Sequence, residues 1–144
     1  MQDGENIIVS TDKSLLNVAL IHGFLTESYW GKGRTIAEVL QTIEHSLCFG
    51  LYMDNRQIGF ARVLSDRVAF AYILDVFILE DYRGQGFSKI LLEKILNYPE
   101  LKIVRKWLLA TKDAHGLYQQ FGFRQIAEPD RLMERVQSMK TVGR

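Results

Sequence analysis

Cysteine and histidine are scarce in this sequence. Its 144 residues include one cysteine, Cys48, which excludes an internal disulfide and a four-cysteine zinc site. Cys48 lies in the apolar run "SLCFGLYM", which favours a buried structural thiol over a nucleophile. The three histidines, His22, His45 and His115, are scattered and show no metal-ligand spacing. We therefore predict that the protein binds no metal.

An excess of charge of one sign and a long apolar run are also missing. The formal net charge is +1, so we do not expect a broad surface for nucleic acid. No apolar run is long enough to cross a bilayer, and the start "MQDGENIIVS" does not have the pattern of a signal peptide. The sequence predicts a cytoplasmic protein with no nucleic-acid or membrane partner. Its length fits a single domain, 1–144, with a core of its own.

What the sequence does contain is an alternation of strand and helix patterns. We expect strands at 6–10, 47–53, 57–64, 68–79, 104–110 and 131–137, and helices at 13–25, 35–44, 87–97 and 113–122. The second helix begins with "TIAE", a capping box of Thr35 and Glu38. The segment "DNRQ" predicts a turn between two antiparallel strands, and Gly122 is a natural C-cap for the last helix. The almost wholly apolar strand at 68–79 should be covered on both faces. This order predicts an α+β fold with a mixed sheet.

The stretch "DYRGQGFSKILLEKIL" joins the strand at 68–79 to the next helix. A helix N-terminus has unpaired N–H groups and the positive end of the helix dipole, and both attract phosphate. Gly84 and Gly86 let the backbone approach an anion without an intervening Cβ, and Arg83 adds a permanent charge. The pattern predicts a diphosphate cradle, although a plain glycine-rich helix start with an exposed arginine remains an alternative. The spacing is neither that of a Walker A loop nor that of a dinucleotide fingerprint.

Two motifs together resemble the GNAT superfamily of N-acetyltransferases. Arg83-Gly84-Gln85-Gly86-Phe87-Ser88 is similar to its [Gln/Arg]-x-x-Gly-x-[Gly/Ala] acetyl-CoA signature, and "AHGLYQQFGF" is similar to its A-x-x-L-Y-x-x-x-G-F segment. The order of helices and strands is similar to that of the family over essentially the whole chain. In the first third the similarity is in layout only. Ser88 stands where Gly or Ala is usual, and we expect altered detail there and not lost binding.

The resemblance implies a GNAT-like fold, a mixed and mostly antiparallel central sheet flanked by helices, with acetyl-CoA as cosubstrate and no metal. It also implies that the fourth strand splays from the fifth, often at a β-bulge, and that the pantetheine arm pairs with backbone in the gap. That backbone would belong to Val76, Phe77 and Ile78. The pyrophosphate would be held by Arg83, Gly84, Gln85, Gly86, Phe87, Ser88 and Lys89, chiefly through the amides of 85–89.

Tyr118 and Asp75 are the candidate catalytic residues. Tyr118 matches the family tyrosine near the thioester sulfur, and a phenol is a suitable general acid toward a thiolate; core packing is its alternative role. Asp75 interrupts an apolar strand, and partial burial can raise a carboxyl pKa into the range of a general base. Asp75 would equally serve as a structural partner of Arg62 or of bulge amides. A water chain in place of a single base is a further alternative.

Acceptor specificity is expected in the loop "ESYWGKGRT". Tyr29 and Trp30 would supply an aromatic wall for an aliphatic or ring-bearing amine, while Trp30 could instead pack the loop onto the sheet. Lys32 and Arg34 suit an acidic acceptor and are equally compatible with solvent-facing charges.

The predicted function is transfer of the acetyl group of acetyl-CoA to a primary amine, by direct attack in a ternary complex. The acceptor is a small molecule or a peptide, and a homodimer is compatible with the sequence. Two alternatives remain open: transfer of a longer acyl group, which Phe77 and Tyr72 would limit, and a non-catalytic acyl-CoA-binding module.

Overall fold

The structure, a computed structural model, describes residues 6–28 and 30–137. It divides into two compact units, an N-terminal unit of Met1–Ala110 and a C-terminal unit of Thr111–Arg144. Each unit is described by itself, and the single-domain organisation stays a prediction.

The elements of the N-terminal unit are β1 (Ile7–Ser10), η1 (Lys13–Leu15), α1 (Val18–Thr26), α2 (Ile36–Glu44), β2 (Leu47–Met53), β3 (Arg56–Ser65), β4 (Phe70–Ile78), η2 (Glu80–Tyr82), α3 (Phe87–Leu96), η3 (Pro99–Leu101) and β5 (Lys106–Leu109). The C-terminal unit contains α4 (His115–Gln119) and η4 (Pro129–Arg131).

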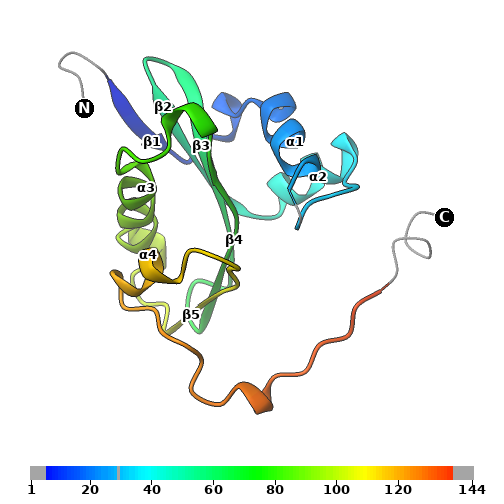
Figure 1. Cartoon of the computed structure of the whole chain (residues 1–144), viewed down its shortest axis with the longest axis vertical. Coiled ribbons are helices and arrows are strands. Elements are labelled where there is room, and N and C mark those ends of the chain that lie inside the picture. Colours follow the sequence, from blue (N-terminus) through cyan, green and yellow to red (C-terminus); the bar gives the residue numbers. More distant parts are fainter. Residues whose placement is uncertain (1–5, 29, 138–144) are drawn as a thin grey trace. The chain divides into compact units, whose positions relative to one another are not determined.

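The sheet of the N-terminal unit confirms the predicted fold class. Its strands lie in the order β1-β2-β3-β4-β5; the first four are antiparallel and β5 runs parallel to β4. Helices α1 and α2 lie over one face and α3 over the other (Figure 1). The core between α1, α2 and the sheet consists of Ile21, Leu25, Val39, Ile43, Cys48, Phe60 and Phe77. This arrangement leaves the end of β4 between the two helical layers.

Several local predictions are confirmed. Thr35 and Glu38 form the capping box of α2. The turn between β2 and β3 has positive φ at Asp54 and Asn55, 50° and 71°, as a tight hairpin of matching twist requires. Cys48 is buried, and burial raises the pKa of its thiol to about 11, so Cys48 is a structural thiol and not a nucleophile.

The helix expected at 13–25 is interrupted. Its start is the short 3-10 turn η1, and α1 begins only at Val18. The reason is Asn17, whose side chain accepts a hydrogen bond from the amide of Leu20, 3.0 Å away. An asparagine in extended conformation at this position caps a new helix and does not continue the old one.

The strand expected at 131–137 is wrong. The described chain there forms the turn η4 followed by residues 132–137 without regular structure, and Leu132, Met133 and Val136 are exposed. A strand pattern needs a neighbouring backbone to pair with, and this segment has none in the part of the chain that the structure describes.

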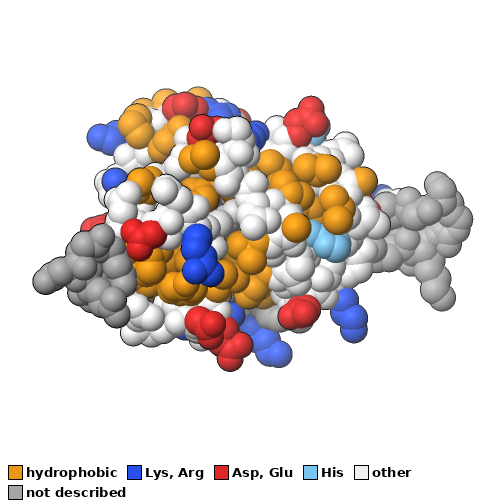
Figure 2. Space-filling model, turned by 90° about the horizontal axis from the view of Figure 1, so that it is seen from above, with side chains coloured by type: hydrophobic (Ala, Val, Ile, Leu, Met, Phe, Trp, Pro, Cys, Tyr) orange, Lys and Arg blue, Asp and Glu red, His pale blue; other side chains and the backbone are white. Residues whose placement is uncertain are grey.

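Among the described residues, no helix has the length and apolar character that a membrane span needs; α3, the longest, has 10 residues. On the face drawn in Figure 2, acidic and basic side chains are interspersed among exposed hydrophobic ones. Among the described residues, no group of three or more potential metal ligands was found.

Candidate functional site

The predicted cradle is a short loop between β4 and α3. Gly84 and Gly86 have positive φ, 78° and 86°, and Gly86 is the N-cap of α3 without a side chain to cap the helix. A Cβ added at either glycine would meet no atom within 4 Å, so the space above the backbone is open. The first amides of α3 therefore face open space at the positive end of a helix dipole, which is a suitable site for an anion.

Arg83 is engaged with the protein itself. Its Nε donates to the carbonyl of Ile78, 3.0 Å away, and its guanidinium carbon lies 5.9 Å from the centroid of the Phe24 ring. The side chain is thus folded over the end of β4 and braces the turn into the cradle. Part of its donor capacity is used before any ligand binds.

Strand β4 has a free edge at the end that leads to the cradle. Strand β5 pairs with it only from Phe70 to Ile73. On the other side, Asp75 and Val76 together lie opposite Ala61 of β3, which is a β-bulge. Beyond the bulge, Phe77 and Ile78 pair with β3 alone among the described residues. The expected splay at a bulge is therefore present, and it leaves backbone groups of 76–78 without a strand on the β5 side.

Asp75 lies at the bulge and is 4% exposed, with φ of 55°. Its Oδ2 accepts from Nη1 of Arg34 and from Nε of Arg62, both at 2.8 Å. Arg62 also donates to Oγ of Ser46, 2.9 Å away. Within residues 6–28 and 30–137, Oδ1 of Asp75 has no hydrogen-bond partner. The alternative that Asp75 is a structural partner of Arg62 is thus realised.

The pKa of Asp75 is lowered, contrary to the raised value expected for a general base. Burial by itself raises this pKa, but the hydrogen bond from Arg34, together with the charge and hydrogen bond of Arg62, outweighs burial. The carboxyl group is therefore ionised at neutral pH, and the resulting carboxylate is a weak base. Its strongest effect in this geometry is to orient the two guanidinium groups.

Aromatic side chains gather beside the free edge. Phe24 of α1 stacks on Phe77 of β4, with centroids 4.1 Å apart and an interplanar angle of 13°. Trp30, 38% exposed, approaches Phe24 with a centroid distance of 6.4 Å. Tyr29, predicted to share this wall, lies outside the described residues.

Phe24 was not predicted as a site residue, and Arg34 was predicted, with Lys32, as a cation for an acidic acceptor but not as a partner of Asp75. Phe24 read as one more apolar position of an amphipathic helix, and Arg34 as one of two loop cations. No local signal distinguishes them, because their partners Phe77 and Asp75 are more than forty positions away along the chain.

Tyr118 belongs to the C-terminal unit. It lies on α4 and is 8% exposed, and its ring meets Phe123 edge to face at 5.9 Å. Burial raises the pKa of its phenol, so the hydroxyl stays protonated at neutral pH. The predicted Gly122 terminus is confirmed: φ is 90°, and the amide of Phe123 donates to the carbonyl of Tyr118, as in a Schellman motif.

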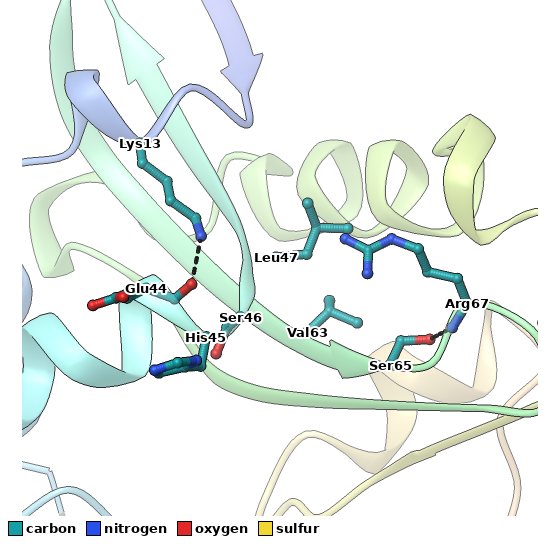
Figure 3. A pocket seen from close by; sticks show the side chains of 8 residues that line it. All are labelled: Lys13, Glu44, His45, Ser46, Leu47, Val63, Ser65 and Arg67. Atoms are coloured by element: carbon teal, nitrogen blue, oxygen red, sulfur yellow. Dashed lines mark hydrogen bonds between the residues drawn. The ribbon is translucent and has the colours of Figure 1, made fainter.

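The N-terminal unit also contains a polar cavity of about 220 Å³, drawn in Figure 3. Its lining is Lys13, Glu44, His45, Ser46, Leu47, Val63, Ser65 and Arg67. The amine of Lys13 points across it to the carbonyl of Glu44, 3.1 Å away. The lining shares no residue with the cradle or with 76–78, so this cavity is not part of the candidate acetyl-CoA site.

Known proteins resemble this chain in sequence and in fold. The model of the acetyltransferase (GNAT) family matches residues 17–123. The "Putative acetyltransferase FG08082" of Gibberella zeae is 31% identical over 147 residues, covering 85% of this chain and 82% of that protein. The stretch that the family model matches includes the cradle and Tyr118.

Two solved structures extend the comparison. The protein xcc2953 of Xanthomonas campestris pv. campestris, described as belonging to the GNAT family, is 48% identical with a TM-score of 0.88, over 91% of this chain and 93% of its own. A GNAT family acetyltransferase of Elizabethkingia anophelis, solved with acetyl-CoA bound, has a TM-score of 0.63 over 96% of this chain and 91% of its own. At 18% identity the second shows a shared fold alone.

Proposed function

Because this chain belongs to the acetyltransferase (GNAT) family, and is therefore an acyltransferase, we propose that it transfers the acetyl group of acetyl-CoA to the primary amine of a small molecule or peptide. The observation that carries the proposal is the open cradle of Gly84 and Gly86 directly after the free edge of β4. One element offers an anion site and the other offers unpaired backbone, the two features that a nucleotide thioester needs.

The cradle and the free edge of β4 together form the proposed site for acetyl-CoA, the acetyl donor. The amides of 85–89 at the start of α3 would hold the diphosphate, helped by the dipole of a helix of 10 residues. The backbone of Val76, Phe77 and Ile78 would pair with the amide groups of the pantetheine arm as an added strand does. Arg83 already bonds Ile78, so we assign it first to shaping the loop and second to the phosphate charge.

The chemistry is nucleophilic attack of a neutral amine on the thioester carbonyl carbon. The C–N bond forms, the C–S bond breaks, and the thiolate takes a proton. Tyr118 is the proposed proton donor, since its phenol is kept protonated by burial. Asp75 is a poor proton acceptor beside two arginines, so we assign removal of the amine proton to water, with Asp75 as a positioning residue.

Two measurements test this proposal. Calorimetry should show acetyl-CoA binding to the wild-type protein, and a thiol reagent should report CoA release when a broad panel of primary amines is supplied. The absence of acetyl-CoA binding would contradict the donor site. Binding without turnover of any amine would contradict the transferase role.

A further inference from the structure

The cluster at the β4 bulge contains more positive charge than its single carboxylate can neutralise. Asp75 contributes one negative charge, and Arg34 and Arg62 contribute two positive ones. The Arg62 side chain is 7% exposed and has two acceptors, Asp75 and Ser46. Arg34, whose side chain is 22% exposed, is the cation of this pair that a ligand from solvent can reach.

Arg34 has unused donors in a fixed position. A guanidinium carries five N–H donors, and in the described part of the chain Asp75 is the single acceptor for this side chain. Its backbone is held on both sides, since its carbonyl contacts Nε2 of His22 at 3.0 Å and its amide donates to the carbonyl of Gly31. The side chain is thus preorganised to meet a ligand.

Two glutamates flank Arg34 in the sequence, Glu27 and Glu38, and neither forms an ion pair with it within the described residues. Glu38, four positions along, is used by the capping box, where its Oε1 accepts from the amide of Thr35 at 2.8 Å. Glu27, at the start of the loop, and Lys32 are both exposed to solvent. The environment of Arg34 therefore favours an incoming anion.

The position of Arg34 is that expected for an acceptor contact. It reaches β4 at Asp75, directly before the residues 76–78 of the free edge. It is held by His22 of α1, two positions before Phe24, which stacks on Phe77. Cation, aromatic surface and free edge therefore belong to one corner of the N-terminal unit.

We propose that Arg34 binds a carboxylate of the acceptor, so that the preferred acceptors are amines that also carry a carboxyl group. A carboxylate matches the planar fork of a guanidinium, which can donate two parallel hydrogen bonds to it. Asp75 is then the residue that orients the guanidinium group of Arg34. This inference names the acceptor class and rests on the proposed transferase function.

The test uses pairs of amines that differ only in the carboxyl group: glycine and methylamine, β-alanine and ethylamine, 4-aminobutyrate and propylamine, phenylalanine and 2-phenylethylamine. Wild-type protein should show a higher kcat/KM for the carboxylate member of at least one pair, by about 10- to 100-fold, the range of a charge-assisted hydrogen bond. Arg34→Gln should remove that preference: the ratio of kcat/KM for the carboxylate to kcat/KM for its neutral partner should fall to about one, chiefly because KM for the carboxylate rises. Arg34→Lys should restore part of the preference.

Lys32→Gln is the matched control, because it removes the same charge from the same loop without touching Asp75. It should keep the preference. Equal loss in Lys32→Gln and Arg34→Gln, or neutral amines used as well as their carboxylates by wild type, would overturn the proposal. So would a protein that binds acetyl-CoA and acetylates no carboxylate-bearing amine of the panel. Calorimetric acetyl-CoA binding separates these outcomes from failure of the transferase function itself, and melting temperatures exclude misfolded variants.

Discussion

Replacing Asp75 by asparagine tests the charge cluster at the bulge with little change of shape. Asparagine tolerates the positive φ of 55° found at this position, so the backbone strain should not change. What is lost is the negative charge between Arg34 and Arg62. The variant therefore isolates the electrostatic contribution of one buried carboxylate.

The magnitude follows from the burial of Arg62. Removing one partner of a buried ion pair costs about 3–5 kcal/mol, because the other charge stays buried without compensation. The amide oxygen of asparagine still accepts a hydrogen bond, which recovers about 1 kcal/mol. We expect the free energy of unfolding at pH 7 to fall by about 2–4 kcal/mol, and the melting temperature by about 5–15 °C for a chain of this size.

The loss should depend on pH in a defined direction. The carboxyl pKa of Asp75 is lowered in the folded protein, so its stabilisation is complete above the unfolded pKa of about 4. It disappears as the pH falls through the folded pKa. The difference between wild type and Asp75→Asn should therefore be largest near neutral pH and shrink in acid.

Urea unfolding at pH 7 and at acid pH, supported by calorimetric melting, checks both statements. The double variant Asp75→Asn, Arg62→Met should be more stable than Asp75→Asn alone, because it also removes the uncompensated buried cation. Glu93→Gln is the control, a neutralised carboxylate on the exposed face of α3. Wild-type stability of Asp75→Asn at pH 7 would refute the reasoning, as would a stability difference that grows in acid.

Three further predictions concern binding and turnover. Gly86→Val should weaken acetyl-CoA binding strongly in calorimetry, because the side chain fills the open cradle and disfavours the φ of 86°. The control Gly23→Ala in α1, where an added Cβ also meets no atom within 4 Å, should bind acetyl-CoA normally. Unchanged affinity in Gly86→Val would contradict the diphosphate assignment. Tyr118→Phe should lower kcat by about 10- to 10⁴-fold in the thiol-release assay with little change in acetyl-CoA affinity or melting temperature; undiminished turnover would leave Tyr118 a packing residue. Trp30→Ala should raise KM for the best amine while acetyl-CoA binding stays near wild type; a parallel loss of both, with a lower melting temperature, would mean that Trp30 only packs the loop.

Local patterns in the sequence were sufficient to predict much of the fold. The capping box of Thr35 and Glu38, the turn at Asp54 and Asn55, and the helix end at Gly122 are all present as expected. Each of these features depends on contacts between residues that are close in sequence, so no distant segment is needed to form it. The backbone conformation of the loop at Gly84 and Gly86 was predictable for the same reason, since both glycines and the start of α3 are neighbours in sequence, whereas its binding of a diphosphate stays a prediction.

Tertiary structure alone decided the electrostatics and the composition of the site. Asp75 obtains its lowered pKa from Arg34, 41 positions earlier, and from Arg62 on the neighbouring strand, and only burial makes those charges decisive. The same dependence on distant partners explains why 131–137, a strand by pattern, forms none among its described residues. Short-range hydrogen bonds and steric preferences act along the chain and can be read from it, whereas burial, ion pairing and strand pairing exist only once distant segments have met.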